Sequence, residues 1–181
     1  MEGIMQALLK TLEELGFETV KELDVSTLKA LPEVRQMCEV NTCGVYNTRW
    51  SCPPGCGSIE ECDKIMHQYT HGILVQTIGD IEDTLDWEGI MEVKEVHDKR
   101  FLQGTERIKE HLDDVLPLGD GACTRCQKCT YPDAPCRFPD LKSSSMEAFG
   151  LFVSDVCKKN GVGYNYGPGK MCYTGCYLFC I

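Results

Sequence analysis

The residue types best suited to chemistry in this chain are its cysteines, which number thirteen. Three of them, Cys123, Cys126 and Cys129, form a CxxCxxC run that places three thiolates on one tight loop. This spacing equals that of the first three ligands in bacterial ferredoxins, so it indicates an iron–sulfur cubane. Cys136 follows after six residues rather than three, and it precedes Arg137 instead of a proline. We infer that Cys136 supplies the fourth thiolate.

A second group of four cysteines occupies an earlier, turn-rich segment. Its members are Cys38, Cys43, Cys52 and Cys56. Pro53 and Pro54 remove two backbone donors and fix φ, and the neighbouring glycines permit turns closed to other residues. Such a loop can wrap thiolates around a metal and leave amides free to donate to sulfur. We therefore predict a second metal site here, against the alternative of a surface loop with incidental cysteines.

Two other uses of these cysteines compete with iron and sulfur. A disulfide framework requires an oxidising compartment, and an odd number of cysteines cannot all pair within one chain. Zinc is the stronger rival, although it usually takes two separated CxxC or CxH pairs. The expected cofactors are therefore [4Fe–4S] clusters, two in number, and zinc is the alternative.

Five cysteines fall outside the two groups. Cys62 and Cys157 lie in amphipathic helical patterns, where we expect them to be buried as small apolar side chains. Cys172, Cys176 and Cys180 have an even spacing that places them on one face of a strand or of a helix. A third metal site that includes Cys157 is one interpretation, and packed or redox-active thiols are the other; the sequence leaves both open.

Most of the chain, roughly from Arg35 to Cys180, resembles an uncharacterised family of cysteine-rich proteins from anaerobic archaea and bacteria. The family is labelled only as predicted metal-binding proteins, a domain of unknown function. The segments that carry the resemblance are Asn41–Gly44, Trp50–Pro54, Cys123–Cys129, Pro135–Pro139 and Ser145–Gly150. The resemblance implies metal binding of an iron–sulfur type, with no assigned reaction. Cys172, Cys176 and Cys180 do not belong to the family pattern.

Length and composition fit one domain spanning residues 1–181, which is long enough to bury its own core. The net charge is −10, and it is unevenly distributed. Residues 1–119 carry 11 Lys and Arg against 23 Asp and Glu, whereas residues 120–181 carry 7 against 5. The acidic part argues against a nucleic-acid partner. No apolar run is long enough for a transmembrane helix, and Met1–Gln6 lacks the features of a signal peptide, so we expect a cytoplasmic protein without a membrane partner.

The pattern of apolar residues predicts an α+β fold with a small sheet, several helices and two cysteine-rich metal-binding loops. Helices are predicted at 4–15, 58–69, 85–115 and 144–158, with a short one between Asp24 and Pro32, and strands at 17–23 and 72–78. Gly104 is a candidate break in the third of these helices. The segment from Tyr164 onward is predicted to form a hairpin that turns at 167–169.

These features favour an electron-transfer protein that exchanges electrons with a redox partner protein. Two alternatives remain: a zinc-stabilised structural or protein-interaction module, and an iron–sulfur enzyme. The sequence shows no Ser/His/Asp constellation and no paired catalytic carboxylates, so whether the protein is an enzyme stays open. The histidines are expected to be surface or packed residues rather than ligands; they are His67, His71, His97 and His111.

Overall fold

The computed structural model describes residues 2–181; Met1, the first residue of the expected domain at 1–181, lies outside them. The described residues form a five-stranded sheet in the order β1-β2-β5-β3-β4. The strands are β1 (Thr19–Leu23), β2 (His71–Asp80), β3 (Val115–Gly119), β4 (Ser144–Ser145) and β5 (Lys170–Phe179). Only the β3–β4 pair is parallel within the described chain.

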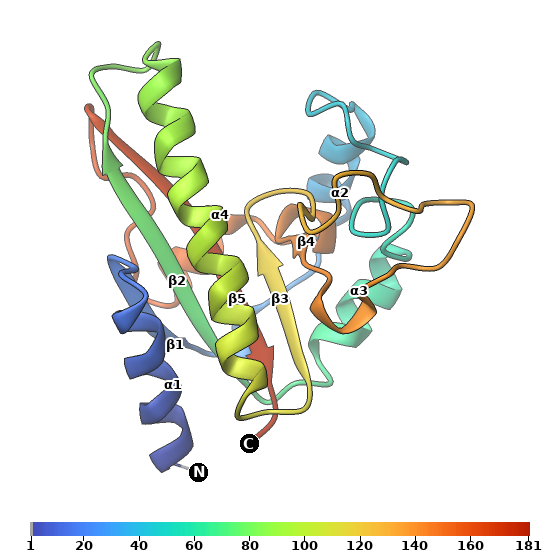
Figure 1. Cartoon of the computed structure of the whole chain (residues 1–181), viewed down its shortest axis with the longest axis horizontal. Helices are drawn as coiled ribbons and strands as arrows, with labels where there is room; N and C mark the ends of the chain where they lie inside the picture. The colour runs from blue at the N-terminus through green and yellow to red at the C-terminus, as the bar shows by residue number, and fades with distance from the viewer. Residues whose placement is uncertain (1) are drawn as a thin grey trace.

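Helices lie on both faces of this sheet and beyond one of its edges (Figure 1). The described residues include the α-helices α1 (Glu2–Glu14), α2 (Pro32–Glu39), α3 (Ile59–Met66), α4 (Trp87–Lys109) and α5 (Val153–Lys159). Three short 3₁₀ turns connect them, at η1 (Val25–Thr27), η2 (Pro139–Leu141) and η3 (Glu147–Phe149). The expected α+β class is therefore confirmed.

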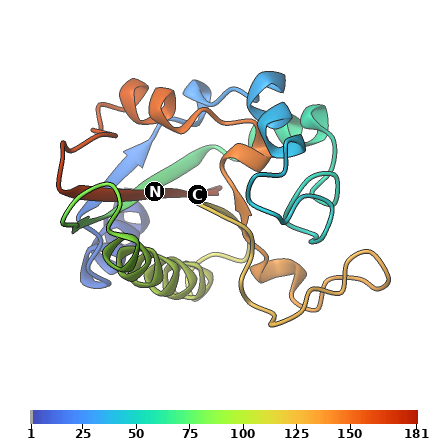
Figure 2. The same cartoon turned by 90° about the horizontal axis from the view of Figure 1, so that it is seen from above.

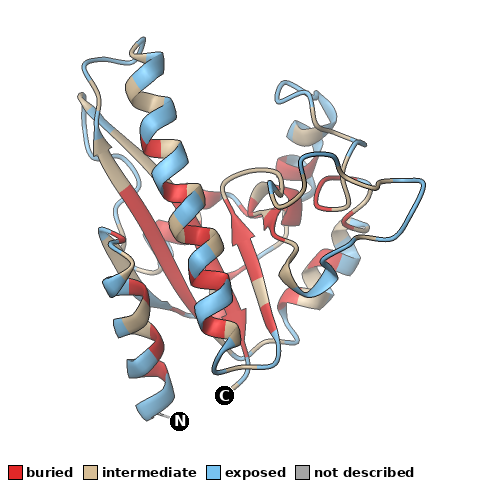
Figure 3. Ribbon diagram, viewed as in Figure 1, coloured by how far each residue is buried: buried red, intermediate tan, exposed pale blue. Residues whose placement is uncertain are grey.

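Two apolar layers enclose the sheet, which Figure 2 shows edge-on. On one face α1 and α4 bury Leu8, Leu12 and Ile108 against the sheet. There Phe101 stacks on Tyr177 of β5, with ring centroids 4.7 Å apart. On the other face α3, α5 and η3 cover β2 and β5 with a second cluster of buried side chains. Because β5 is central and covered on both faces, its residues 174–179 are all buried, as Figure 3 shows in red.

Several helix ends follow from local sequence signals. Ser58 and Glu61 form a reciprocal capping box at the start of α3, which satisfies two backbone donors that would otherwise lack partners. Asp86 caps α4 by accepting a hydrogen bond from the Gly89 amide. Residue Gly104 neither breaks nor ends α4, which continues to Lys109. This glycine is instead required by close packing, because an added Cβ would collide with the hydroxyl of Tyr177.

Two predicted elements are wrong. The helix predicted over 144–158 is divided into β4, η3 and α5, because Gly150 adopts a left-handed conformation at φ 76°. Its carbonyl accepts a hydrogen bond from the Leu31 amide at 2.8 Å, which holds this turn against the start of α2. The predicted hairpin after Tyr164 is a single long strand, β5, whose partners are the distant strands β2 and β3.

Two elements were not predicted. Helix α2 begins at Pro32, where a short helix was expected to have ended, since proline is well suited to the first helical turn. Strand β3 follows α4 directly and contains Pro117. Proline lacks an amide donor and is therefore disfavoured in a strand that pairs on both sides. In β3 this conflict does not arise, because the pairing with β4 is limited to Leu118 and Gly119. Pro117 therefore lies where β4 does not reach.

The thiol-rich segments lie beyond the β3–β4 edge. In both views the loop that follows α2 and the loop between β3 and η2 lie together, near α2, α3 and η3 (Figures 1 and 2). The sheet and α4 form the other side of the molecule. Residues more than seventy positions apart in sequence, such as Ser51 and Cys123, therefore come together at one edge of a rigid sheet.

The packing around Gly104 gives a test of the fold. Alanine normally stabilises a helix interior relative to glycine, but Gly104→Ala should destabilise the protein by about 1–3 kcal/mol because its Cβ meets Tyr177. The cost should fall in a Tyr177→Phe background, where the colliding oxygen is absent. Gly3→Ala in α1 is the control, since nothing lies within 4 Å of the added Cβ. Urea unfolding compares the wild type with four variants: Gly104→Ala, Tyr177→Phe, the double variant and Gly3→Ala. Equal stability changes at the two glycines would contradict the packing described.

Candidate metal centres

The four cysteines of the CxxCxxC group line one cavity. They come from the loop between β3 and η2, and each is half-buried. The walls are completed by Arg49, Trp50 and Ser51 from the earlier loop and by Phe138 and Lys142. The structure therefore brings together every cysteine that the sequence assigned to this group, namely Cys123, Cys126, Cys129 and Cys136. We call this space the second cavity, because its cysteines come later in the chain than those of the other group.

The earlier loop holds the second cavity in shape through side-chain contacts. Ser51 Oγ accepts a hydrogen bond from the Cys123 amide at 3.0 Å. Arg49 Nη1 donates to the Cys123 carbonyl at 3.1 Å, and Trp50 Nε1 donates to the Ala134 carbonyl at 2.9 Å. The Trp50 ring also meets Tyr131 edge-on, with centroids 4.9 Å apart. The two cysteine-rich loops thus form one unit.

The second cavity favours negative charge. Burial of the Cys129 thiol raises its pKa, but hydrogen bonds from the Trp50 and Tyr131 amides and the charge of Arg49 outweigh burial and lower it. Arg125 also lines the cavity. Its Nη2 is buried and has no hydrogen-bond partner among residues 2–181. A buried donor without a partner is costly, so an anionic occupant such as a thiolate-bound metal centre fits this site.

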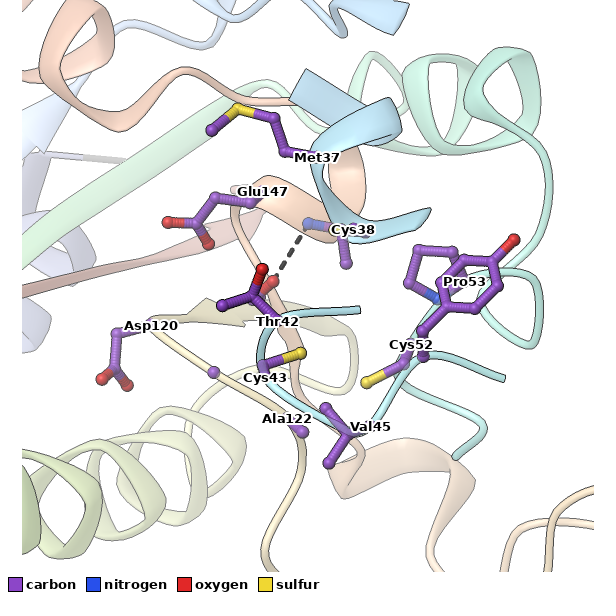
Figure 4. Close-up of a pocket in the computed structure, with 14 residues that line it drawn as sticks. Met37, Cys38, Thr42, Cys43, Val45, Cys52, Pro53, Asp120, Ala122 and Glu147 are labelled. Atoms are coloured by element: carbon purple, nitrogen blue, oxygen red, sulfur yellow. Dashed lines mark hydrogen bonds between the residues drawn. The ribbon is translucent and has the colours of Figure 1, made fainter. Parts of the chain in front are cut away.

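The earlier group lines a larger space, which we call the first cavity (Figure 4). Its volume is ≈ 290 Å³, against ≈ 20 Å³ for the second cavity. Three of the four predicted cysteines line it: Cys38 at the end of α2, Cys43 and Cys52. Asp120 after β3 and Glu147 in η3 also line the cavity, and Glu147 lies near Cys38 (Figure 4). Neither carboxylate was singled out from the sequence, although Glu147 lies inside the segment Ser145–Gly150.

Cys56, the fourth member of the earlier group, does not line the first cavity. It is buried in the core beside Cys62 and Ala148. Its Sγ donates toward the Ala148 carbonyl at 3.9 Å, and its hydrogen bond with Cys62 raises its pKa while lowering that of Cys62. Cys62 is fully buried, as predicted. The structure therefore gathers three thiols of this group and places the fourth against the core.

Burial raises the pKa of two thiols and one carboxyl group in the first cavity. Burial raises the pKa of Cys38, with a further contribution from Glu147, and burial also raises the pKa of Cys52. Glu147 itself is raised by burial and by the nearby Asp120. These thiols therefore resist ionisation without a cation to hold the thiolate form. A bound metal supplies that charge, because metal binding and thiol deprotonation are linked.

The two cavities share their walls. Arg49, Trp50 and Ser51 line the second cavity, and the next two residues, Cys52 and Pro53, line the first cavity. Within 120–126, the residues 120–122 line the first cavity, and Cys123 begins the second. The charges of both Cys43 and Cys123 act on the Cys52 thiol. Occupants of the two cavities would therefore be immediate neighbours.

A buried arginine connects the elements around the first cavity. Arg35 of α2 is 8% exposed. Its guanidinium donates to the Ala148 carbonyl of η3 at 2.7 Å, to the Gly57 carbonyl, and to Cys62 Sγ at 3.6 Å. Sequence reasoning missed this residue, because a charged side chain in a short helix gives no sign of burial.

The residues of the two cavities suit more than one kind of metal centre. Zinc in a four-thiolate site binds each sulfur at about 2.3 Å, and a cubane takes one thiolate at each of its iron atoms. In residues 2–181, no group of three or more His, Cys, Asp or Glu side chains is placed to hold a single metal ion. Both kinds of centre use cysteine thiolates, and cysteines line both cavities.

The remaining cysteines and histidines lie outside both cavities. Cys176 is fully buried in β5, and Cys157 is fully buried in α5, where burial and the nearby Cys172 raise its pKa to about 11. Cys180 is exposed. His97 is a packed residue, as expected: it is buried on α4, its Nδ1 lies 3.0 Å from Thr77 Oγ1, and burial lowers its pKa to about 4.

Comparison with known proteins identifies the family. Residues 21–179 match the family described as predicted metal-binding protein (DUF2284), so the chain belongs to that family. The match covers both cavities, and the protein is accordingly a cysteine-rich metal-binding domain. Searches of the curated proteins and of the solved structures found no match. None of the helices in residues 2–181 is long and apolar enough to cross a membrane.

Replacing the buried arginine tests the contacts around the first cavity. Arg35→Met should destabilise the protein by about 2–4 kcal/mol, because it leaves buried carbonyl groups at Ala148 and Gly57 without donors. Arg107→Met is the control, since that side chain is exposed and forms a surface ion pair with Glu110. Urea unfolding of both variants gives the comparison. Equal midpoints would show that Arg35 does not connect these elements.

The cysteines of β5 give a second test. We expect the combined variant Cys172→Ser, Cys176→Ala and Cys180→Ser to keep the full metal content, since none of these thiols lines either cavity. The comparison variant replaces Cys123, Cys126 and Cys129 by serine and should lose metal. Elemental analysis of both proteins provides the measurement. Metal loss from the β5 variant, with unfolding excluded by circular dichroism, would establish a third site.

Proposed function

We propose that this protein is an iron–sulfur electron-transfer protein that holds two [4Fe–4S] clusters, one in each cavity. The observation that supports this most is the second cavity, which all four thiols of the CxxCxxC group line. A [4Fe–4S] cluster supplies one-electron redox chemistry when it is bound. In this proposal the ligands in the second cavity are Cys123, Cys126, Cys129 and Cys136.

The surrounding residues match what such a centre requires from a protein. The amides that donate toward Cys129 stabilise negative charge on its sulfur, and hydrogen bonds to sulfur are one determinant of cluster potential. Arg49, Arg125 and Lys142 add positive charge to the walls. The edge-on pair of Trp50 and Tyr131 packs the two loops against each other.

The shared walls explain why two centres in one small domain suit electron transfer. Cys52 and Cys123 belong to different cavities, yet their charges interact. Rigid contacts at Ser51 and Arg49 fix the separation between the two sites. An electron that enters at one centre therefore has a short, fixed path to the other. A partner protein that supplies or removes this electron is part of the proposal.

Metal analysis tests the assignment. Protein purified without oxygen should be brown and contain about eight iron and eight sulfide per chain. Cys126→Ser should lose about four irons and make the 121–143 loop more sensitive to protease, while the helix content persists. Cys180→Ser, which lies outside both cavities, is the matched control and should keep all eight. A colourless wild-type protein with stoichiometric zinc and no sulfide would instead support a zinc-stabilised module.

A further inference from the structure

The first cavity differs from the second in its lining. It offers three thiols instead of four, and two acidic side chains that the second cavity lacks, Asp120 and Glu147, also line it (Figure 4). The first cavity therefore has one thiolate fewer than a fully cysteine-bound cubane requires.

Cys56 is held away from the first cavity by its surroundings. Its amide donates to the Cys52 carbonyl at 3.1 Å, and the Gly57 amide donates to the Pro54 carbonyl at 3.0 Å, so the intervening turn is closed. The same turn is tightly packed at Gly55, where an added Cβ would lie 2.5 Å from the Arg49 carbonyl oxygen. Moving Cys56 into the cavity would break its contacts with Cys62 and Ala148 and reorganise this turn.

We propose that the first cavity binds its cluster through only three cysteines, Cys38, Cys43 and Cys52, and that the fourth iron is left open for a small molecule. This inference rests on the proposed function, because it takes the occupant of the first cavity to be a [4Fe–4S] cluster. The small molecule binds the open iron through one donor atom and lies between that iron and the carboxyl groups of Asp120 and Glu147. The site is thus a ligand-binding centre, and the fully ligated second cavity is its neighbour.

The walls restrict the chemistry of the ligand. Most of the remaining lining is apolar, from Met37, Val45, Tyr46, Pro53, Ala122 and Ala148. Three thiolates and two carboxyl groups disfavour an anion, although Lys94 lies 3.2 Å from Asp120 Oδ2 and offsets part of this charge. The cavity therefore suits a small neutral or cationic molecule that has an oxygen or nitrogen donor for iron and a hydrogen-bond donor for the carboxyl groups.

The test uses the intact protein and a small iron ligand. ¹³C-labelled hydrogen cyanide, the neutral form that predominates at pH 7, is added to the reduced protein, and electron paramagnetic resonance spectra are recorded. On binding, its carbon attaches to iron and its proton passes to a carboxylate of the cavity, so the site takes up no net charge. The signal of the cluster with the open iron should change and acquire ¹³C hyperfine coupling. The other signal should stay unchanged, because an iron that already has four protein and sulfide ligands does not bind cyanide readily. The signal that changes should be absent from Cys52→Ser and retained in Cys126→Ser.

A matched pair of valine variants tests the location. Val45 lines the first cavity, and Val40 is 75% exposed outside it. Val45→Phe should fill the cavity and weaken cyanide binding at least about tenfold while the iron content stays at eight. Val40→Phe should bind as the wild type does. If the two variants bind cyanide equally, the open iron does not face this cavity and the inference fails.

Cys56→Ala provides the remaining comparison. It should retain about eight irons and the cyanide response. Loss of about four irons from Cys56→Ala, with unchanged protease resistance, would make Cys56 the fourth ligand and overturn the inference.

Eight irons in the wild type with no cyanide response would also overturn the inference while leaving the two-cluster proposal intact. Four irons with the first cavity empty would overturn both, and iron analysis of the same samples distinguishes these results.

Discussion

The buried guanidinium of Arg35 is the interaction on which the metal-binding half of the molecule depends. Burying a charge is unfavourable unless its donors are matched by acceptors. Arg35 meets that condition with carbonyl groups from two separate segments, at Gly57 and Ala148. These contacts fix α2 against η3 and against the turn that contains Cys56. Cys38 follows Arg35 by less than one turn of α2, so the same contacts set the position of this thiol relative to Glu147.

The two cysteine-rich loops are also held in place by contacts with each other. Neither loop has regular structure over most of its length, and both are poor in buried apolar residues. They are ordered instead by side chains that reach from one backbone to the other, at Arg49, Trp50 and Ser51. The β3–β4 edge provides the platform for this unit. Because β4 is only two residues long, the chain leaves the sheet quickly and carries η3 to the first cavity.

Spacing alone determines part of the geometry of the cysteine groups. Three thiols in a CxxCxxC run must be close, and the structure places all four members of that group around one cavity. Spacing was less informative for Cys56, whose side chain is directed by its contacts with Cys62 and Ala148. Arg35 and Asp120 were missed for a related reason. Their roles arise from tertiary contacts that leave no local pattern.

In the fold, too, elements set by local sequence were predicted, whereas elements set by tertiary contacts were not. Helices with complete local signals, such as the capping box of α3, were predicted at nearly the observed bounds. The apolar spacing after Ser144 resembled a helix, but the left-handed Gly150 divides that segment. Strand β5 was taken for half of a hairpin, because its partners lie far away in the sequence. Non-local pairing of this kind has no signature in the strand itself.

The central place of β5 has a consequence for the order in which the protein matures. This strand joins β2 to β3, and all eight cysteines of the two groups precede it along the chain. During synthesis, both sets of thiols therefore leave the ribosome before the sheet beneath them can close. Contacts between residues so distant in sequence form late in folding. The nascent chain thus passes through a stage in which its thiols are accessible to a metal donor, or to oxidation, before the finished scaffold surrounds them.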